Sequence, residues 1–163
     1  MKNILTTLSI IFAAICAAAL LSAQALAPAQ VRANILATAH KLLGVGYVMG
    51  GSSEAGFDCS GYVKYVYEKN GIRLPRTAPA QYLKGAKIPI EKARPADLVF
   101  FDVYKQGVSH VGIYLGDMKF IHAPSPGGRV SIAVIDQYYW KDKLVGAAAF
   151  LEEPAPQKDP KKP

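Results

Sequence analysis

The spacing of hydrophobic and polar positions changes along the chain and divides it into segments. An unbroken apolar run covers residues 10–21. Apolar residues then recur at near-helical spacing over residues 29–43, which predicts an amphipathic helix that ends at Gly44. A second helix is predicted from Cys59 to about Asn70, because apolar side chains share one face and a glycine follows.

The second half of the chain has a different pattern, in which short apolar runs alternate with turn signals. Strands are expected over residues 98–101, 109–115, 119–123, 130–135 and 144–151. Short helices are expected over residues 77–82 and 136–143. Helices that come first and strands that follow predict an α+β fold.

Residues 1–27 are predicted to be an export signal. Lys2 is followed by the apolar run, whose length suits the core of a signal peptide, and residues 25–27 (Ala-Leu-Ala) supply a small-x-small cleavage site. An uncleaved membrane anchor fits less well, because the run is short for a membrane span. We therefore expect a protein exported to the periplasm or cell wall, without a transmembrane segment once the signal is removed.

The remaining chain is expected to form one domain over residues 28–151. Residues 152–163 contain proline, charged residues and few apolar ones, which predicts a disordered tail. The 163-residue chain is 51% hydrophobic and carries a formal net charge of +7, so a collagen-like or wholly disordered protein is excluded. The basic charge suits an anionic surface such as a cell wall, whereas no pattern typical of nucleic-acid binding is present.

Cys59 is the candidate nucleophile. The other cysteine, Cys16, would leave with the signal, so Cys59 would have no disulfide partner in its own chain. It begins a predicted helix capped by Asp58, where backbone N–H groups and the helix dipole favour a thiolate. A glycine-rich loop over residues 44–56 leads into it and indicates an open cleft. The alternative is a buried structural cysteine.

A cysteine nucleophile needs a base, and histidine is the usual one. His40 lies in the first helix, where a solvated or locally hydrogen-bonded side chain is the better interpretation. His110 and His122 lie on neighbouring predicted strands, where they are suited to serve as base and orienting residue. A zinc site built from Cys59 and these two histidines is disfavoured, because no closely spaced pair of ligands is present.

The pairing of the two strands limits this hypothesis. A two-residue turn at Gly116-Asp117 would place His110 and His122 on opposite faces of the sheet. A catalytic pair therefore requires a three-residue loop, a bulge, or a His110 that lies just outside the regular strand.

The motifs together resemble the NlpC-type cell-wall peptidases, papain-like cysteine enzymes that cut peptidoglycan stem peptides. The resemblance covers about residues 30–151. Its strongest motif is Gly56-Phe57-Asp58-Cys59-Ser60-Gly61-Tyr62-Val63. Further matching segments are Tyr47 with Gly50-Gly51, Leu74-Pro75-Arg76 with Gln81, and residues 95–101, 110–114 and 120–123.

The resemblance implies a papain-like domain over residues 28–151. In this fold N-terminal helices, with the nucleophile at a helix N-terminus, pack on an antiparallel sheet of about five strands. It also implies Cys59 as nucleophile, His110 as base and His122 as the third polar residue. Tyr47 would lie near the oxyanion site with the backbone N–H of Cys59.

Asp58 and Ser60 are expected to contact the substrate, although helix capping explains Asp58 equally well. One departure is Ala96, which replaces the glycine usual before the aspartate of its motif.

The expected function is that of an exported cysteine endopeptidase. A thiolate–imidazolium pair would attack an amide of a stem peptide that contains D-amino acids and a diamino acid, through a thioester, without a metal or other cofactor. The expected protein is a monomer. The alternatives are a non-catalytic wall-binding module, and an amidase or acyltransferase that acts on a non-wall amide.

Overall fold

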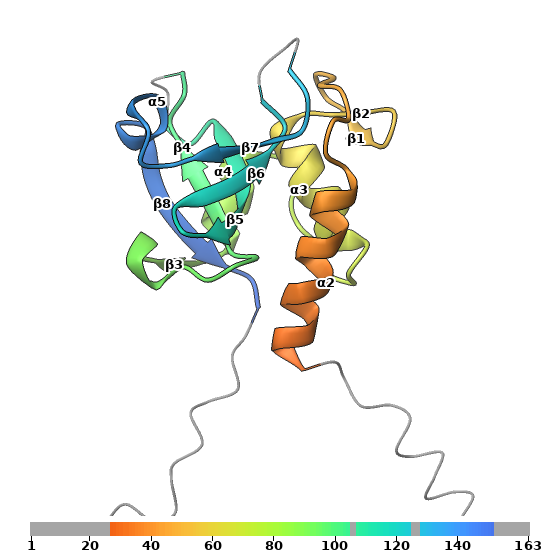
Figure 1. Cartoon of the computed structure of the whole chain (residues 1–163), viewed down its shortest axis with the longest axis horizontal. Helices are drawn as coiled ribbons and strands as arrows, with labels where there is room; N and C mark the ends of the chain where they lie inside the picture. The colour runs from red at the N-terminus through yellow and green to blue at the C-terminus, as the bar shows by residue number, and fades with distance from the viewer. Residues whose placement is uncertain (1–26, 105–106, 125–127, 152–163) are drawn as a thin grey trace, which may run out of the picture.

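The computed structural model describes residues 27–104, 107–124 and 128–151. The helices α2 (Pro28–Lys41) and α3 (Cys59–Glu68) lie on one side and a sheet on the other, α5 (Tyr138–Lys141) lies at the far side of the sheet, and the described chain starts and ends at the same end of the molecule (Figure 1). The predicted disordered tail and all but the last residue of the predicted signal lie outside these ranges. Within them, no helix is both long and apolar enough to span a membrane.

The helical side consists mainly of α2 (Pro28–Lys41) and α3 (Cys59–Glu68), which lie against each other. Proline begins α2, where its missing N–H costs no hydrogen bond, and Ile35 and Ala39 point into the core. The α3 helix is capped by the carboxylate of Asp58, which accepts a hydrogen bond of 2.7 Å from the backbone N–H of Gly61. The other helices are α4 (Ala78–Lys84), η2 (Ile90–Lys92) and α5 (Tyr138–Lys141).

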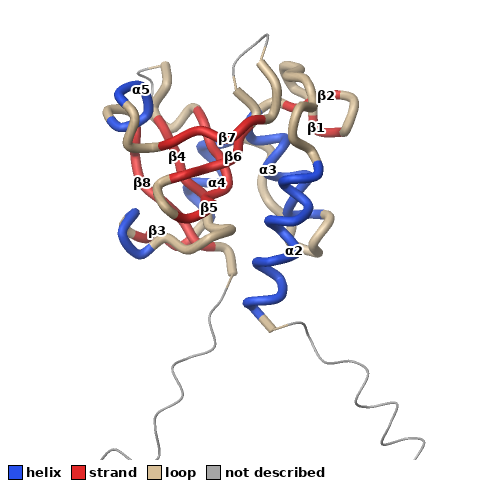
Figure 2. The backbone as a smooth tube through the Cα atoms, viewed as in Figure 1, coloured by secondary structure: helices blue, strands red, loops and turns tan. Residues whose placement is uncertain are grey.

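An antiparallel sheet of six described strands forms the second layer (Figure 2). Its spatial order is β3-β8-β4-β5-β6-β7. The bounds are β3 (Ala86–Ile88), β4 (Leu98–Phe101), β5 (His110–Gly116), β6 (Lys119–His122), β7 (Ser131–Val134) and β8 (Leu144–Ala149). The short edge strand β3 carried no clear pattern in the sequence, which explains why about five strands were expected.

Both faces of the central strand β4 are buried. Leu98 and Phe100 join the core between the sheet and the helices, whereas Val99 and Phe101 join a second core on the opposite face. An apolar run without alternation is therefore the pattern that this strand requires.

The glycine-rich loop before α3 contains a small hairpin that the sequence did not predict. Its strands are β1 (Ser52–Ser53) and β2 (Gly56–Phe57). The hairpin packs against α3, and the loop approaches the helix closely: a Cβ added at Gly61 would lie 2.0 Å from the carbonyl oxygen of Gly51. Only glycine fits at this contact, so the loop fixes the start of α3.

The turn between β5 and β6 is not the one expected at Gly116-Asp117. Gly116 pairs with Lys119, and the two turn residues between them, Asp117 and Met118, have φ values of 50° and 55°. The register shifts between Tyr114 and Gly116, which leaves an extra residue on β5. A bulge is one of the three arrangements that would let the two histidines share a face.

The α+β class and the papain-like arrangement of helices and antiparallel sheet are confirmed.

Candidate active site

Cys59 occupies the first turn of α3 and is partly exposed. Burial raises the pKa of its thiol, and the negative charge of Asp58 raises it further. Backbone N–H groups of Val111, Ser60 and Cys59 itself act in the opposite direction without reversing the shift. The helix N-terminus therefore does not produce the free thiolate that the sequence suggested, because removal from water outweighs it.

His110 and His122 are brought together on one face of the sheet. His110 Nε2 lies 2.8 Å from His122 Nδ1, a hydrogen-bond distance, and both side chains are buried. The bulge near Tyr114 puts the two imidazoles on the same face. Gly112 leaves room for them, because a Cβ there would lie 3.2 Å from the Cβ of His122 and 2.5 Å from the ring of Phe120.

Burial lowers the pKa of both histidines, and the charge of His122 lowers that of His110 further. The resting pair is therefore neutral: each imidazole carries one proton, and one of these two protons lies in the hydrogen bond between the rings. If His110 Nε2 carries this proton and His122 Nδ1 accepts it, the remaining nitrogen of His110, Nδ1, is free to act as a base. The thiolate–imidazolium pair expected from the sequence is thus not the resting state that these environments favour.

Cys59 and His110 line the same cavity, whose volume is about 140 Å³. The cavity is formed where the N-terminus of α3 meets the start of β5, and it brings together residues from four separate segments. Its lining residues are Tyr47, Met49, Asp58, Cys59, Ser60, Tyr104, Ser109 and His110. His122 lies behind His110 and completes the row Cys59, His110, His122.

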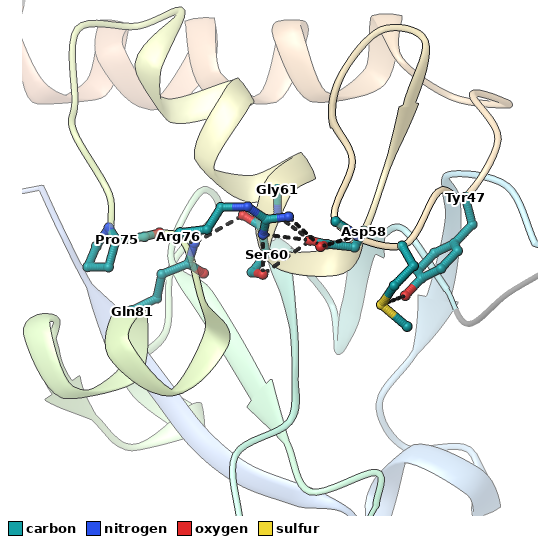
Figure 3. A network of polar contacts seen from close by, with 9 residues as sticks. Tyr47, Asp58, Ser60, Gly61, Pro75, Arg76 and Gln81 are labelled. Carbon is teal, nitrogen blue, oxygen red and sulfur yellow. Dashed lines mark hydrogen bonds and ion pairs between the residues drawn. The ribbon is translucent and has the colours of Figure 1, made fainter.

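Tyr47 stands at the rim of this cavity, and its hydroxyl contacts the Met49 sulfur at 3.5 Å (Figure 3). Burial and the neighbouring Cys59 raise the pKa of its phenol, so the hydroxyl keeps its proton and remains a hydrogen-bond donor. On the other side, the backbone N–H groups of Val103 and Tyr104 donate to Ser109 Oγ and hold the preceding loop against β5.

Asp58 and Ser60 are tied to a residue that the sequence analysis did not single out as a site residue. The guanidinium of Arg76 contacts both carboxylate oxygens of Asp58, one at 2.9 Å and the other at 2.5 Å, and Ser60 Oγ at 3.0 Å. Figure 3 shows this guanidinium beside the start of α3. Gln81 reaches the same turn and donates to the carbonyl oxygens of Ser60 and Pro75.

These contacts define the charge state of Asp58. Burial alone would raise the pKa of its carboxyl, but hydrogen bonds from Arg76 and from the Gly61 N–H outweigh this and hold the pKa below its usual range. Gly50 N–H also donates to it at 3.1 Å. The Asp58 carboxylate thus joins the loop, the helix and Arg76, and its lowered pKa favours the charged form. Arg76 lies 18 residues from Asp58, and no local spacing rule connects them.

A zinc site would need several ligand side chains to converge in the described part of the chain. No group of three or more histidine, cysteine, aspartate or glutamate side chains there is arranged to hold an ion. The row of Cys59, His110 and His122 is suited to proton transfer and nucleophilic attack instead.

Comparison with known proteins places this geometry in a family. The model of the NlpC/P60 family matches residues 44–149. A gamma-DL-glutamyl hydrolase of Bacillus subtilis is 41% identical over 136 residues, which are 82% of this chain and 33% of that protein. The murein DD-endopeptidase MepH of Escherichia coli is 43% identical over 114 residues, which are 67% of this chain and 42% of that protein.

Solved structures agree with the sequence comparison. An NLP/P60-family protein of Staphylococcus aureus, described as similar to lipoprotein, superposes with a TM-score of 0.69 and 39% identity over 76% of this chain and 42% of that one. The chain thus spans less than half the length of each of these three relatives. The family match and the fold establish that this chain belongs to the NlpC/P60 family.

Proposed function

We propose that the protein is a cysteine-type endopeptidase that hydrolyses amide bonds in peptidoglycan stem peptides. The observation that carries the proposal is the row formed by Cys59 and His110, which share one cavity, and His122, which is bonded to His110 at 2.8 Å. Relatives named as a gamma-DL-glutamyl hydrolase and a murein DD-endopeptidase support a substrate that contains D-amino acids.

The first step is attack of the Cys59 sulfur on the amide carbonyl. Because the resting thiol and imidazole are both neutral, His110 Nδ1 takes the thiol proton as the carbon–sulfur bond forms. His122 Nδ1 accepts the hydrogen bond from His110 Nε2–H and stabilises the imidazolium that results. The oxyanion is proposed to accept hydrogen bonds from the backbone N–H of Cys59 and from the hydroxyl of Tyr47, which lines the same cavity.

The second half of the reaction returns the enzyme to its starting state. The carbon–nitrogen bond breaks and the His110 imidazolium protonates the leaving amine, which leaves a thioester on Cys59. Water, deprotonated by His110, then attacks the thioester. The carboxylic acid departs and the proton returns to the Cys59 thiol.

Asp58, Ser60 and Arg76 are proposed to contribute binding rather than proton transfer. Their side chains are hydrogen-bonded together beside Cys59, and the Asp58 and Ser60 side chains line the cavity. These charged and polar side chains are proposed to contact the amine and the carboxylates of a stem peptide. Export to the periplasm or cell wall is likewise proposed, on the signal-like residues 1–27 and the formal charge of +7.

The test is digestion of purified sacculi and of defined muropeptides, with products identified by mass spectrometry. Wild type is expected to produce new termini whose masses identify the bond, and Cys59→Ala is expected to produce none. Sacculus binding without cleavage by either protein would instead support a wall-binding module. The absence of both binding and cleavage would support an amidase or acyltransferase that acts on a different amide.

A further inference from the structure

The histidine pair is covered by an aromatic side chain that the proposed mechanism does not use. Trp140 belongs to α5, and its ring centroid lies 5.3 Å from that of His110 with the planes 30° apart. It meets His122 edge-on at 5.0 Å and 88°. One indole therefore contacts both imidazoles, stacked on the first and perpendicular to the second.

Two further aromatic rings lie against the pair. Phe101 lies 6.2 Å from His110 and Phe120 lies 4.7 Å from His122, between ring centroids. Both phenylalanines are fully buried and belong to strands of the sheet, and both contact Trp140 at about 5 Å. Trp140, which is itself partly buried, thus forms one side of an aromatic enclosure whose other two sides are Phe101 and Phe120 of the sheet.

Trp140 is the one member of this enclosure that is not in a strand. The single turn of α5 is held by backbone hydrogen bonds from Trp140 and Lys141 to Gln137 and by one from Lys143 to Trp140. The indole therefore depends on a short connection between β7 and β8 rather than on the sheet ladder.

We propose that Trp140 is a positioning residue that seals the His110–His122 pair from water and holds the His110 ring in the plane needed to face Cys59. The inference rests on the proposed function, since it assigns Trp140 to the same proton-transfer site. The physical reason is that burial opposes the charged form of an imidazole, and a stacked ring limits its rotation.

Other charged groups do not explain the enclosure. The titratable side chains that share the cavity with His110 are Tyr47, Asp58, Cys59 and Tyr104. The pKa of His110 is lowered first by burial and then by the charge of His122. On α5 the nearest charge in sequence is Lys141, whose exposed ammonium lies 3.9 Å from Asp136. Water exclusion by the aromatic rings is thus the property that a change at Trp140 would remove.

Nuclear magnetic resonance titration of the two imidazoles tests the proposal without requiring a substrate. The titration uses protein with ¹⁵N-labelled histidine and Cys59→Ala, to separate imidazole protonation from the thiol. Trp140→Leu is expected to raise the protonation midpoints of His110 and His122 by about one pH unit or more, because water that reaches the imidazoles stabilises their charged form. Trp140→Phe, which keeps a ring, is expected to produce a smaller shift in the same direction.

Tyr139→Leu is the matched control. Tyr139 is on the same helical turn and contacts Trp140 at 4.9 Å, but it is 49% exposed. It is expected to leave both midpoints unchanged. With Cys59 intact, Trp140→Leu is also expected to move the acidic limb of the kcat/KM profile upward by the same amount.

Midpoints that do not move in Trp140→Leu, or that fall, would overturn the proposal. If Trp140→Leu does not fold, Trp140→Phe decides the result in the same way. A protein that cleaves no wall substrate but shows the expected shifts would refute the proposed function and keep the sealing role. Normal cleavage of a wall substrate together with unshifted histidine midpoints would support the proposed function and refute the sealing role of Trp140.

Discussion

The buried histidine pair is predicted to make the folded protein sensitive to mild acid. In the folded chain the pKa values of His110 and His122 fall from 6.5 to about 3 and about 4. The unfolded chain therefore binds more protons than the folded chain as the pH falls below 6.5. Stability is complete above that pH and is lost as the pH falls toward the folded pKa values.

The magnitude follows from the width of this window. Each pKa unit corresponds to about 1.4 kcal/mol, so between pH 6.5 and pH 5 each histidine removes about 2 kcal/mol from the free energy of unfolding. Together they remove about 4 kcal/mol, a large part of the roughly 5–15 kcal/mol that stabilises a typical domain.

Urea unfolding at pH 7, 6 and 5, followed by circular dichroism, measures the effect. The comparison is with a double variant, His110→Gln with His122→Asn, whose side chains do not titrate. His40→Asn is a control that shows how removal of an exposed imidazole on α2 changes the free energy of unfolding at each pH. Wild type is expected to lose about 4 kcal/mol more than the double variant between pH 7 and pH 5. Equal losses in the two proteins would refute the reasoning, because they would show that the pair is not held neutral by burial.

Two further substitutions test the packing that supports the site. Gly112→Ala adds a Cβ 2.5 Å from the ring of Phe120 and 3.2 Å from His122, so urea unfolding should show a loss of about 1–3 kcal/mol and cleavage should fall more than tenfold; unchanged cleavage would contradict the tight fit of the histidine pair. Arg32→Met removes a 2.8 Å ion pair to the carboxylate of Asp97, which is 1% exposed, and should cost about 3–5 kcal/mol of unfolding free energy while cleavage per folded molecule stays the same; a thermal melt like that of wild type would contradict it.

Local signals were sufficient to predict the helix that begins at Cys59. Asp58 precedes Cys59 at a predicted helix start, and the structure has that cap with Gly61 N–H as its donor. A short-range motif specifies such a feature because its hydrogen bonds join residues within four positions of one another.

The strand register was not predictable from the same kind of signal. Gly116 favoured a turn that begins one residue too early. The observed turn residues are Asp117 and Met118, both at positive φ, and a bulge between Tyr114 and Gly116 shifts the strand register by one residue. Only the requirement that His110 and His122 share a face indicated that the simple turn was wrong. The expectation that His110 and His122 act together therefore limited the possible strand registers, whereas the turn preferences of the residues did not.

Contacts between distant segments were the least accessible to sequence reasoning. Arg76 and Trp140 reach the site from a bend before α4 and from a single helical turn, and neither has a spacing that links it to Cys59. Ala96 shows the reverse case, because the resemblance marked it as replacing a glycine and the structure explains why. Its φ is 72°, a left-handed conformation that glycine adopts without steric cost.

The most direct test of the central claim is to trap the acyl-enzyme on Cys59. Protein turning over a defined stem peptide is quenched in acid, and its mass is measured intact and after proteolysis. The Cys59-containing peptide is expected to gain the mass of the acyl fragment and to lose it on treatment with hydroxylamine, as a thioester does. An adduct on any other residue, or cleavage at the wild-type rate by Cys59→Ala, would contradict it.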